Sequence, residues 1–172
     1  MVLSVKDGTM DGKLRNMATV YLRKGDRMLL LYRQGGRVVN NVWTGSAGGH
    51  FEQNELNDAK ACVLREMKEE LRLSPEDVAG LSLRYITLRY TKGEIRQNYY
   101  FFAELKASMD ENLVSNEGQC QWFSLAETQK LDMPFSARHM MDHYLAIGQY
   151  TDAVYVGTDS PQKMFFSELR EF

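Results

Sequence analysis

Cysteine is scarce in this sequence of 172 residues, which holds only Cys62 and Cys120. Neither has a second Cys or a His at the spacing that is typical of a zinc site. Cys62 lies within an expected helix and Cys120 lies before an expected strand, so we interpret both as reduced thiols of the core. This cysteine usage is typical of a cytoplasmic protein.

Long apolar runs and a strong net charge are also missing. The longest apolar stretches, such as residues 28–32, are far shorter than the roughly 20 residues that a membrane helix needs. We expect no basic and apolar leader. The net charge is −2 and the pI is near 5.9. We therefore expect neither a membrane nor a nucleic acid polymer as a partner.

The remaining composition fits one ordinary globular domain. Hydrophobic residues make up 44% and charged residues 26% of the chain, which is enough for a full core. We expect a single domain over residues 1–172, in which residues 1–13 form a loose segment without hydrophobic periodicity. The composition is compatible with either a monomer or a homodimer.

Strand-like and helix-like patterns are mixed along the chain without strict alternation, which indicates the α+β class. A hairpin is expected at residues 16–22 and 28–33, and a longer one at residues 81–90 and 97–105. Further strands are expected at residues 121–124, 154–156 and 164–166. One helix should begin after Asn57 as its N-cap and reach Leu71 or Leu73, and a second should cover residues 136–147.

A glycine turn at Gly48 and Gly49 leads into the first of these helices, which carries a cluster of carboxylates. Glu66, Glu69 and Glu70 stand at i, i+3 and i+4, so they project from one helical face. Such a cluster on its own is often just a solvated surface, but a solvated face usually mixes charges of both signs. Here Lys68 and Arg72 lie on the far side of the helix. An oxygen-only cluster suits Mg²⁺ or Mn²⁺ better than zinc.

The spacing of these residues resembles the Nudix box, the signature of hydrolases that cleave nucleoside diphosphates linked to another moiety. The matching positions are Gly49, Glu55, Arg65, Glu66, Met67, Glu69 and Glu70. The resemblance implies an α/β/α sandwich with a mixed sheet over about residues 16–145. It also implies that Glu66, Glu69, Glu70 and Gly48 bind the metal, and that Glu66, Glu69 and Arg65 are catalytic.

Two positions depart from the family pattern. The spacer between Glu55 and Arg65 has nine residues instead of the usual seven, so it is open whether these two side chains meet. Arg72 stands where the family usually has glycine, and we expect it to continue the helix.

Other residues are candidates for substrate contact, and each has a plainer alternative. Arg33 and Arg37, in a polar segment beside the box, could contact phosphate or be ordinary surface charges. Glu117 matches a later loop position that supplies the general base in some relatives, but it could be a simple loop carboxylate. Phe135 could stack on a base or be a core aromatic at a helix start.

The resemblance favours a hydrolase that converts a nucleoside triphosphate to its monophosphate and pyrophosphate. The segment after the Glu117 loop resembles MutT-type enzymes, which act on oxidised purine nucleotides such as 8-oxo-dGTP. Ser136 and Ala137 replace the paired acids of purine-selective relatives, so the base is open. ADP-ribose, nucleotide sugars and dinucleoside polyphosphates remain alternatives, as does a regulator that only binds nucleotides. The complete set of helix carboxylates favours an enzyme, and neither cysteine has the context of the family's isoprenyl diphosphate isomerases.

Overall fold

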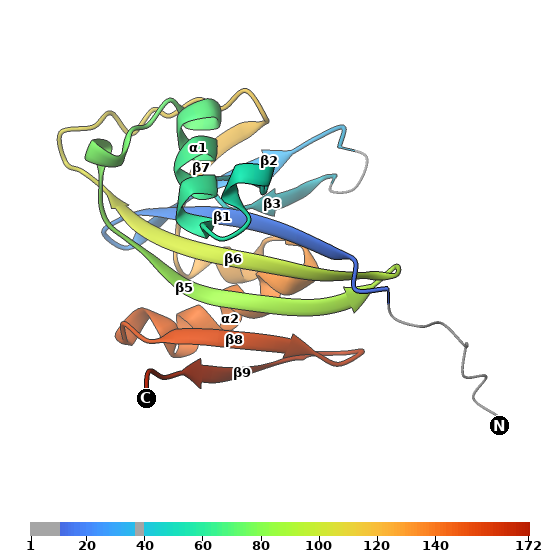
Figure 1. Ribbon diagram of the computed structural model, residues 1–172. Helices are drawn as coiled ribbons and strands as arrows, with labels where there is room; N and C mark the ends of the chain where they lie inside the picture. Colours follow the sequence, from blue (N-terminus) through green and yellow to red (C-terminus); the bar gives the residue numbers. More distant parts are fainter. Residues whose placement is uncertain (1–10, 37–39) are drawn as a thin grey trace.

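The computed structural model describes residues 11–36 and 40–172, and its centre is one large mixed sheet (Figure 1). The strands in these residues are β1 (Leu14–Lys24), β2 (Arg27–Arg33), β3 (Val42–Thr44), β4 (Ala47–His50), β5 (Val78–Thr91), β6 (Glu94–Leu105), β7 (Gln119–Ser124), β8 (Val154–Asp159) and β9 (Met164–Leu169). The α-helices are α1 (Ala59–Leu71) and α2 (Phe135–Ala146). Short 3-10 helices are η1 (Gln53–Glu55), η2 (Pro75–Asp77), η3 (Glu127–Lys130) and η4 (Gly148–Tyr150).

The strand order is β3-β2-β1-β6-β5-β8-β9, with β4 paired to β1 and β7 paired to β2. The β1–β6 and β5–β8 pairs are parallel, whereas the β1–β2, β5–β6 and β8–β9 pairs are antiparallel. β1 and β6 therefore lie at the middle of the sheet. The sandwich with a mixed sheet is confirmed.

The long β5–β6 hairpin follows directly from its turn residues. Lys92 and Gly93 connect the strands, and both have positive φ, 53° and 77°. Two such residues form the type I′ turn, whose twist matches that of the flanking strands. The hairpin is longer than its sequence pattern predicted, because both strands extend to this turn.

The two helices pack on opposite faces of the sheet, as strand β1 shows. Val20 and Leu22 belong to the cluster that contains Met67 of α1, whereas Tyr21 belongs to the cluster that contains Tyr144 of α2. Successive strand residues point to opposite faces, so one strand serves both cores. A helix, the sheet and a helix thus form three layers, with α1 and α2 on either side in Figure 1.

Most elements agree with the sequence patterns, including both hairpins, β7, α2 and the terminal β8–β9 pair. Strands β3 and β4 were not predicted. The expected glycine turn before α1 is wrong, because Ala47–His50 form β4 and pair with β1. Three residues of this strand are small, so its sequence lacks the β-branched and aromatic signal of a strand.

The ends of α1 also differ from the expectation. The N-cap is Asp58, whose carboxylate accepts a hydrogen bond from the Ala61 amide at 2.9 Å, and not Asn57. Arg72 does not continue the helix. It is the C-cap in the left-handed conformation, with φ 58° and ψ 27°, and its amide bonds back to Lys68. Arg72 thus takes the backbone geometry that glycine usually supplies at a helix end.

The N-terminal expectation concerns residues 1–13, of which residues 1–10 lie outside the described part; Asp11 to Lys13 precede β1 without regular structure. In residues 11–36 and 40–172, no helix is both long and apolar enough to span a membrane.

Candidate functional site

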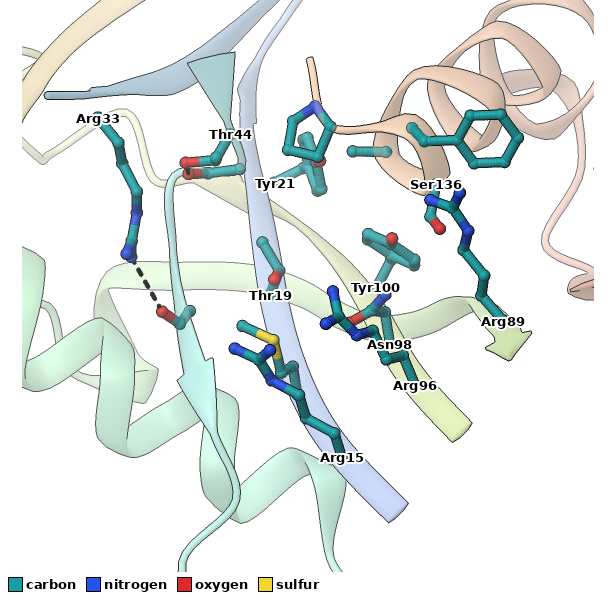
Figure 2. A pocket seen from close by; sticks show the side chains of 16 residues that line it. Arg15, Thr19, Tyr21, Arg33, Thr44, Arg89, Arg96, Asn98, Tyr100 and Ser136 are labelled. Carbon is teal, nitrogen blue, oxygen red and sulfur yellow. Dashed lines mark hydrogen bonds between the residues drawn. The ribbon is translucent and has the colours of Figure 1, made fainter. Parts of the chain in front are cut away.

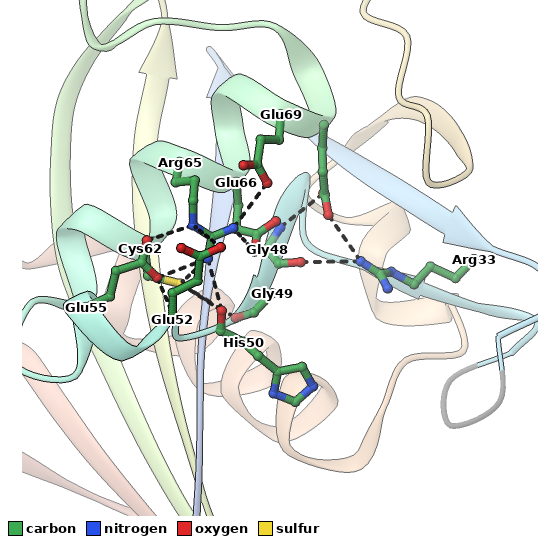
Figure 3. Close-up of polar contacts among 11 residues, drawn as sticks. Arg33, Gly48, Gly49, His50, Glu52, Glu55, Cys62, Arg65, Glu66 and Glu69 are labelled. Atoms are coloured by element: carbon green, nitrogen blue, oxygen red, sulfur yellow. Dashed lines mark hydrogen bonds and ion pairs between the residues drawn. The ribbon is translucent and has the colours of Figure 1, made fainter.

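Arg65 on α1 lies at the centre of a polar network that joins α1 to the segment before it (Figure 3). Its guanidinium donates to Glu55 through Nε and Nη2, at 2.7 and 3.0 Å. Nη1 donates to Glu66 at 2.8 Å and to Glu69 at 3.1 Å. A further bond from Nη2 reaches the His50 carbonyl at 3.0 Å. One arginine thereby fixes the box segment against the helix.

The nine-residue spacer does not prevent the contact between Glu55 and Arg65. Glu55 ends η1, where its carboxylate accepts a hydrogen bond from the Glu52 amide at 2.9 Å. Leu56 and Asn57 then lead to the Asp58 cap. Glu55 is 3% exposed, and its hydrogen bonds with Arg65 lower its pKa to about 2.

Glu66 lies against the glycine strand β4. It is 8% exposed, and burial raises the pKa of its carboxyl group, which the bond from Arg65 only partly offsets. A Cβ on Gly49 would overlap the Glu66 carboxylate. Glycine is therefore required at position 49 so that the backbone of β4 can approach the Glu66 carboxylate closely. Gly49 does not have a positive φ, so its backbone conformation is not the reason for glycine. This explains why the motif needs glycine although β4 is extended.

Glu70 is the second buried carboxylate of the helix, at 7% exposed. It accepts a hydrogen bond from the Gly48 amide at 3.2 Å, and the Arg33 guanidinium stands 3.5 Å away. Burial is the main effect on this group and raises its pKa to about 7, against the opposing influence of Arg33. Arg33 also donates to the Gly48 carbonyl at 3.4 Å.

Glu69 differs from its two neighbours, because its side chain is 56% exposed. In the described part of the chain, no three carboxylate, His or Cys side chains converge on one point in this conformation. Arg65 holds Glu66 and Glu69 (Figure 3), whereas Arg33 faces Glu70 at 3.5 Å. The three expected metal ligands therefore share a helix but point to two different arginines.

The donor set nevertheless fits a hard divalent cation. Its ligand atoms are all oxygens, and the raised pKa values of Glu66 and Glu70 show that burial disfavours their negative charges. A cation among them would remove that penalty. Because the three side chains do not converge in this conformation, chelation by all three requires side-chain rotations.

The structure places Glu117 close to this cluster. It lies in the loop before β7, and its charge contributes to the raised pKa of Glu70. The Glu117 carboxylate is exposed, and its amide bonds to the Ser115 hydroxyl at 3.1 Å. The sequence separates these two acids by 46 residues, and the pairing of β7 with β2 brings the loop towards the helix. Arg37 lies outside the described residues.

A cavity of about 190 Å³ opens beside the carboxylate cluster, between the sheet and the start of α2 (Figure 2). Arg33 and Gly48 line the side near the cluster. The remaining wall combines strand residues with the start of α2, including Thr19, Asn98, Tyr100, Phe135 and Ser136. The cavity thus offers aromatic faces and hydrogen-bonding groups next to the carboxylates.

Phe135 lines this cavity as expected, but it also packs within the protein. The Arg89 guanidinium lies 4.3 Å from the centre of its ring, and His139 meets the ring edge-on at 4.5 Å. Phe135 is therefore placed both to contact a ligand in the cavity and to pack against its protein neighbours.

The cavity residues that the sequence reasoning missed include three arginines, Arg15, Arg89 and Arg96. Arg89 and Arg96 lie seven positions apart across the β5–β6 turn, in a segment without a binding or catalytic motif. Arg15 is distant in sequence, and only the pairing of β1 with β6 identifies it as their neighbour.

A model of the NUDIX domain matches residues 13–144 of the chain. No curated protein sequence matches it. Three similar solved structures are the Mutator MutT protein of Bacillus halodurans, the ORF135 protein of E. coli and the Ap4A hydrolase of C. elegans. Their TM-scores are 0.63, 0.65 and 0.60, and their sequence identities are 21%, 17% and 19%. The matches cover 89%, 84% and 81% of this chain and 97%, 98% and 99% of theirs. At these identities the structural likeness supports the fold.

Proposed function

Because the chain belongs to the Nudix family and is a pyrophosphohydrolase, we propose that its substrate is a nucleoside triphosphate, cleaved to the monophosphate and pyrophosphate. Mg²⁺ or Mn²⁺ is the proposed cofactor, and the proposed setting is the cytoplasm. The observation that carries the proposal is the position of the cavity. Arg33 and Gly48 belong both to its wall and to the carboxylate cluster.

The metal would be held by Glu66, Glu69, Glu70 and the Gly48 carbonyl. A bound divalent ion supplies charge neutralisation at the phosphate oxygens and a more acidic water. Arg65 positions Glu66 and Glu69 through its hydrogen bonds and so acts on the reaction through them. Arg33 would contact the phosphate chain, because it lines the cavity beside Glu70 and a guanidinium forms strong charge-assisted hydrogen bonds with phosphate.

Glu117 is the proposed general base. Its carboxylate is exposed at the edge of the cluster and close to Glu70, so a water between them would pass its proton to Glu117. We assign Arg37 to the phosphate contacts as well, on its position in the sequence alone.

The nucleoside would occupy the cavity and stack on Phe135. Ser136 and Ala137 stand where purine-selective relatives have paired acids, and both line the cavity. A buried acid discriminates strongly because a wrong base leaves it without a partner. Without those acids, we expect the preference for 8-oxo-dGTP over dGTP to stay below about a thousandfold, roughly 4 kcal/mol.

The test is a panel of substrates under one Mg²⁺ concentration, with products separated and identified. The panel contains the common nucleoside triphosphates, 8-oxo-dGTP, ADP-ribose, a nucleotide sugar and a dinucleoside polyphosphate. The proposal expects the highest kcat/KM for a triphosphate, with monophosphate and pyrophosphate as products. A higher kcat/KM for ADP-ribose, a nucleotide sugar or a dinucleoside polyphosphate would replace the proposed substrate. Binding without turnover of any compound would favour a regulator.

A further inference from the structure

Three arginines form a continuous row across neighbouring strands at one end of the cavity (Figure 2). Arg15 of β1 is the register partner of Arg96 of β6, and Arg96 is the partner of Arg89 of β5. Residues directly opposite each other on paired strands point to the same face. The row Arg15–Arg96–Arg89 therefore presents three positive charges on the α2 face of the sheet.

This arrangement is unfavourable for the stability of the sheet by itself. Like charges directly opposite each other on paired strands repel. Two such pairs occur here, Arg15 with Arg96 and Arg96 with Arg89. The next three β1–β6 pairs on this face contain no charged residue. Moving along β1 from the arginine row, Met17 faces Asn98, Thr19 faces Tyr100 and Tyr21 faces Phe102. The next pair on this face, Arg23 and Glu104, joins opposite charges, so among these β1–β6 pairs like charges face each other only at the arginine row.

The protein's own acids compensate this charge only in part. Arg89 Nε stands 3.0 Å from an Asp159 oxygen, and Arg96 Nε stands 3.6 Å from a Glu94 oxygen. Arg96 Nε is a buried atom with no hydrogen-bond partner, although such donors normally have one. Within residues 11–36 and 40–172, Arg15 has no carboxylate partner and bonds instead to His50 Nε2 at 3.0 Å.

The guanidinium groups are also held in place rather than left free in solvent. Each of the three side chains is partly buried. Arg89 is additionally held against the ring of Phe135. Fixed planar donor forks suit a phosphoryl group, which offers three oxygens and carries up to two negative charges. The hydrogen-bonding edge of a nucleobase is neutral, so its binding would leave most of the positive charge of these three arginines uncompensated.

We propose that the row Arg15–Arg96–Arg89 binds a phosphoryl group at the end of the substrate that is remote from the scissile anhydride. This proposal rests on the proposed function, because it takes the carboxylate cluster as the cleavage site. Arg33 and Gly48 line the cavity beside that cluster, and the row lines another part of the same wall. The substrate class is therefore a nucleotide with a second phosphoryl group, for example on a ribose hydroxyl.

The first experiment measures binding without any hydrolysis. Inorganic phosphate is titrated into the protein at constant ionic strength and in excess EDTA, and the thermal unfolding midpoint is recorded. Wild type should gain about 2–4 °C at saturating phosphate. The Arg15→Gln/Arg96→Gln variant should show at most a quarter of that gain. Its midpoint without phosphate should equal or exceed that of wild type, because the cross-strand repulsion is gone.

A matched control removes two arginines that lie outside the cavity. Arg72→Gln/Arg170→Gln changes the net charge by the same amount, and both side chains are exposed. The control should keep the full phosphate effect. No phosphate effect in wild type, or the same effect in the row variant, would overturn the proposal. If the double variant does not fold, Arg15→Gln alone is measured by the same criteria.

A second arm distinguishes a phosphoryl group of the substrate from free phosphate. The Kd values of AMP and adenosine 3′,5′-bisphosphate, which differ by one remote phosphoryl group, are compared in EDTA. The bisphosphate should bind at least tenfold more tightly to wild type and to the control, and the ratio should fall to near one in the row variant. Equal Kd values in wild type would assign the row to free phosphate and overturn the substrate assignment. Because neither arm requires turnover, a failure of the proposed hydrolysis is recognised separately.

Discussion

The Arg65 guanidinium holds the Glu55 carboxylate through two hydrogen bonds, from Nε to Oε1 at 2.7 Å and from Nη2 to Oε2 at 3.0 Å. The spacer between the two residues is longer than usual for the family. The fold accommodates the extra residues, so Arg65 still forms both hydrogen bonds with Glu55. Because the same guanidinium also bonds Glu66 and Glu69, this pair sets the position of two expected metal ligands.

Arg65→Lys should therefore reduce both stability and activity. A lysine ammonium cannot reproduce the planar fork, so Glu55, which is buried, loses at least one of its two bonds. We expect a loss of about 1–3 kcal/mol in the free energy of unfolding, measured by urea denaturation. Lys68→Gln on the same helix should change it by less than about 0.5 kcal/mol. An Arg65→Lys protein as stable as this control would show that the two-bond geometry contributes little.

The pH dependence of stability should have opposite signs for Glu55 and Glu70. The pKa of Glu55 falls from 4.5 to about 2 on folding, so its contribution is present above pH 4.5 and is lost as the pH falls towards 2. The pKa of Glu70 rises from 4.5 to about 7, so its contribution is present below pH 4.5 and is lost as the pH rises through 7.

These signs are tested by urea denaturation of the metal-free protein between pH 3 and 8. The stability advantage of wild type over Glu55→Gln should shrink as the pH falls below 4.5. The stability of wild type relative to Glu70→Gln should decrease between pH 4.5 and 7, by on the order of 1–3 kcal/mol. Parallel curves for wild type and Glu70→Gln would contradict the raised pKa.

Arg72→Gly should stabilise the protein without changing its activity. Arg72 holds the left-handed conformation at the end of α1, which costs a residue with a Cβ about 1–2 kcal/mol. Part of that gain is offset because glycine is more flexible in the unfolded chain, so we expect a net gain of about 0.5–1 kcal/mol. Arg72→Ala keeps the Cβ and should show no gain. Equal stability of the two variants would mean that the backbone conformation is not the cause.

Glu117→Gln should lower kcat with little change in the fraction of folded protein. General-base effects are typically about 10²–10⁴-fold, and the exposed position of Glu117 leaves the core unaffected. Activity and circular dichroism are measured together, with Glu76→Gln as a control at an exposed acid of η2. A decrease in kcat of less than twofold would return Glu117 to the role of a simple loop carboxylate.

The sequence was sufficient for the features that are local in the chain. The carboxylates at positions 66, 69 and 70 share a helix because α-helical periodicity places them there, and the β5–β6 hairpin follows from Lys92-Gly93. The backbone at Arg72 and the β4 strand were misjudged for a physical reason. Tertiary contacts, such as the pairing of β4 with β1 and the contact of Gly49 with Glu66, override the local propensity of these residues.

The arginine row as a whole was beyond the reach of local patterns, because the position of Arg15 beside Arg96 and Arg89 depends on the pairing of two strands that are distant in sequence. Arg15 and Arg96 are 81 positions apart, and only the parallel pairing of β1 with β6 places them opposite each other. The same holds for Glu117, which comes near Glu70 through the pairing of β7 with β2. In both examples the sequence supplied the residue types, and the sheet topology determined which of them are neighbours.

We expect the carboxylates of α1 to bind a divalent metal and to support hydrolysis of a phosphoric anhydride. The most direct measurement is pyrophosphate release from the best triphosphate, in Mg²⁺ and in excess EDTA, for wild type, Glu69→Gln and Glu70→Gln. We predict turnover by wild type in Mg²⁺, none in EDTA, and rates at least about a hundredfold lower in both variants, which should remain folded. Full turnover in EDTA, or unchanged rates in both variants, would contradict the account.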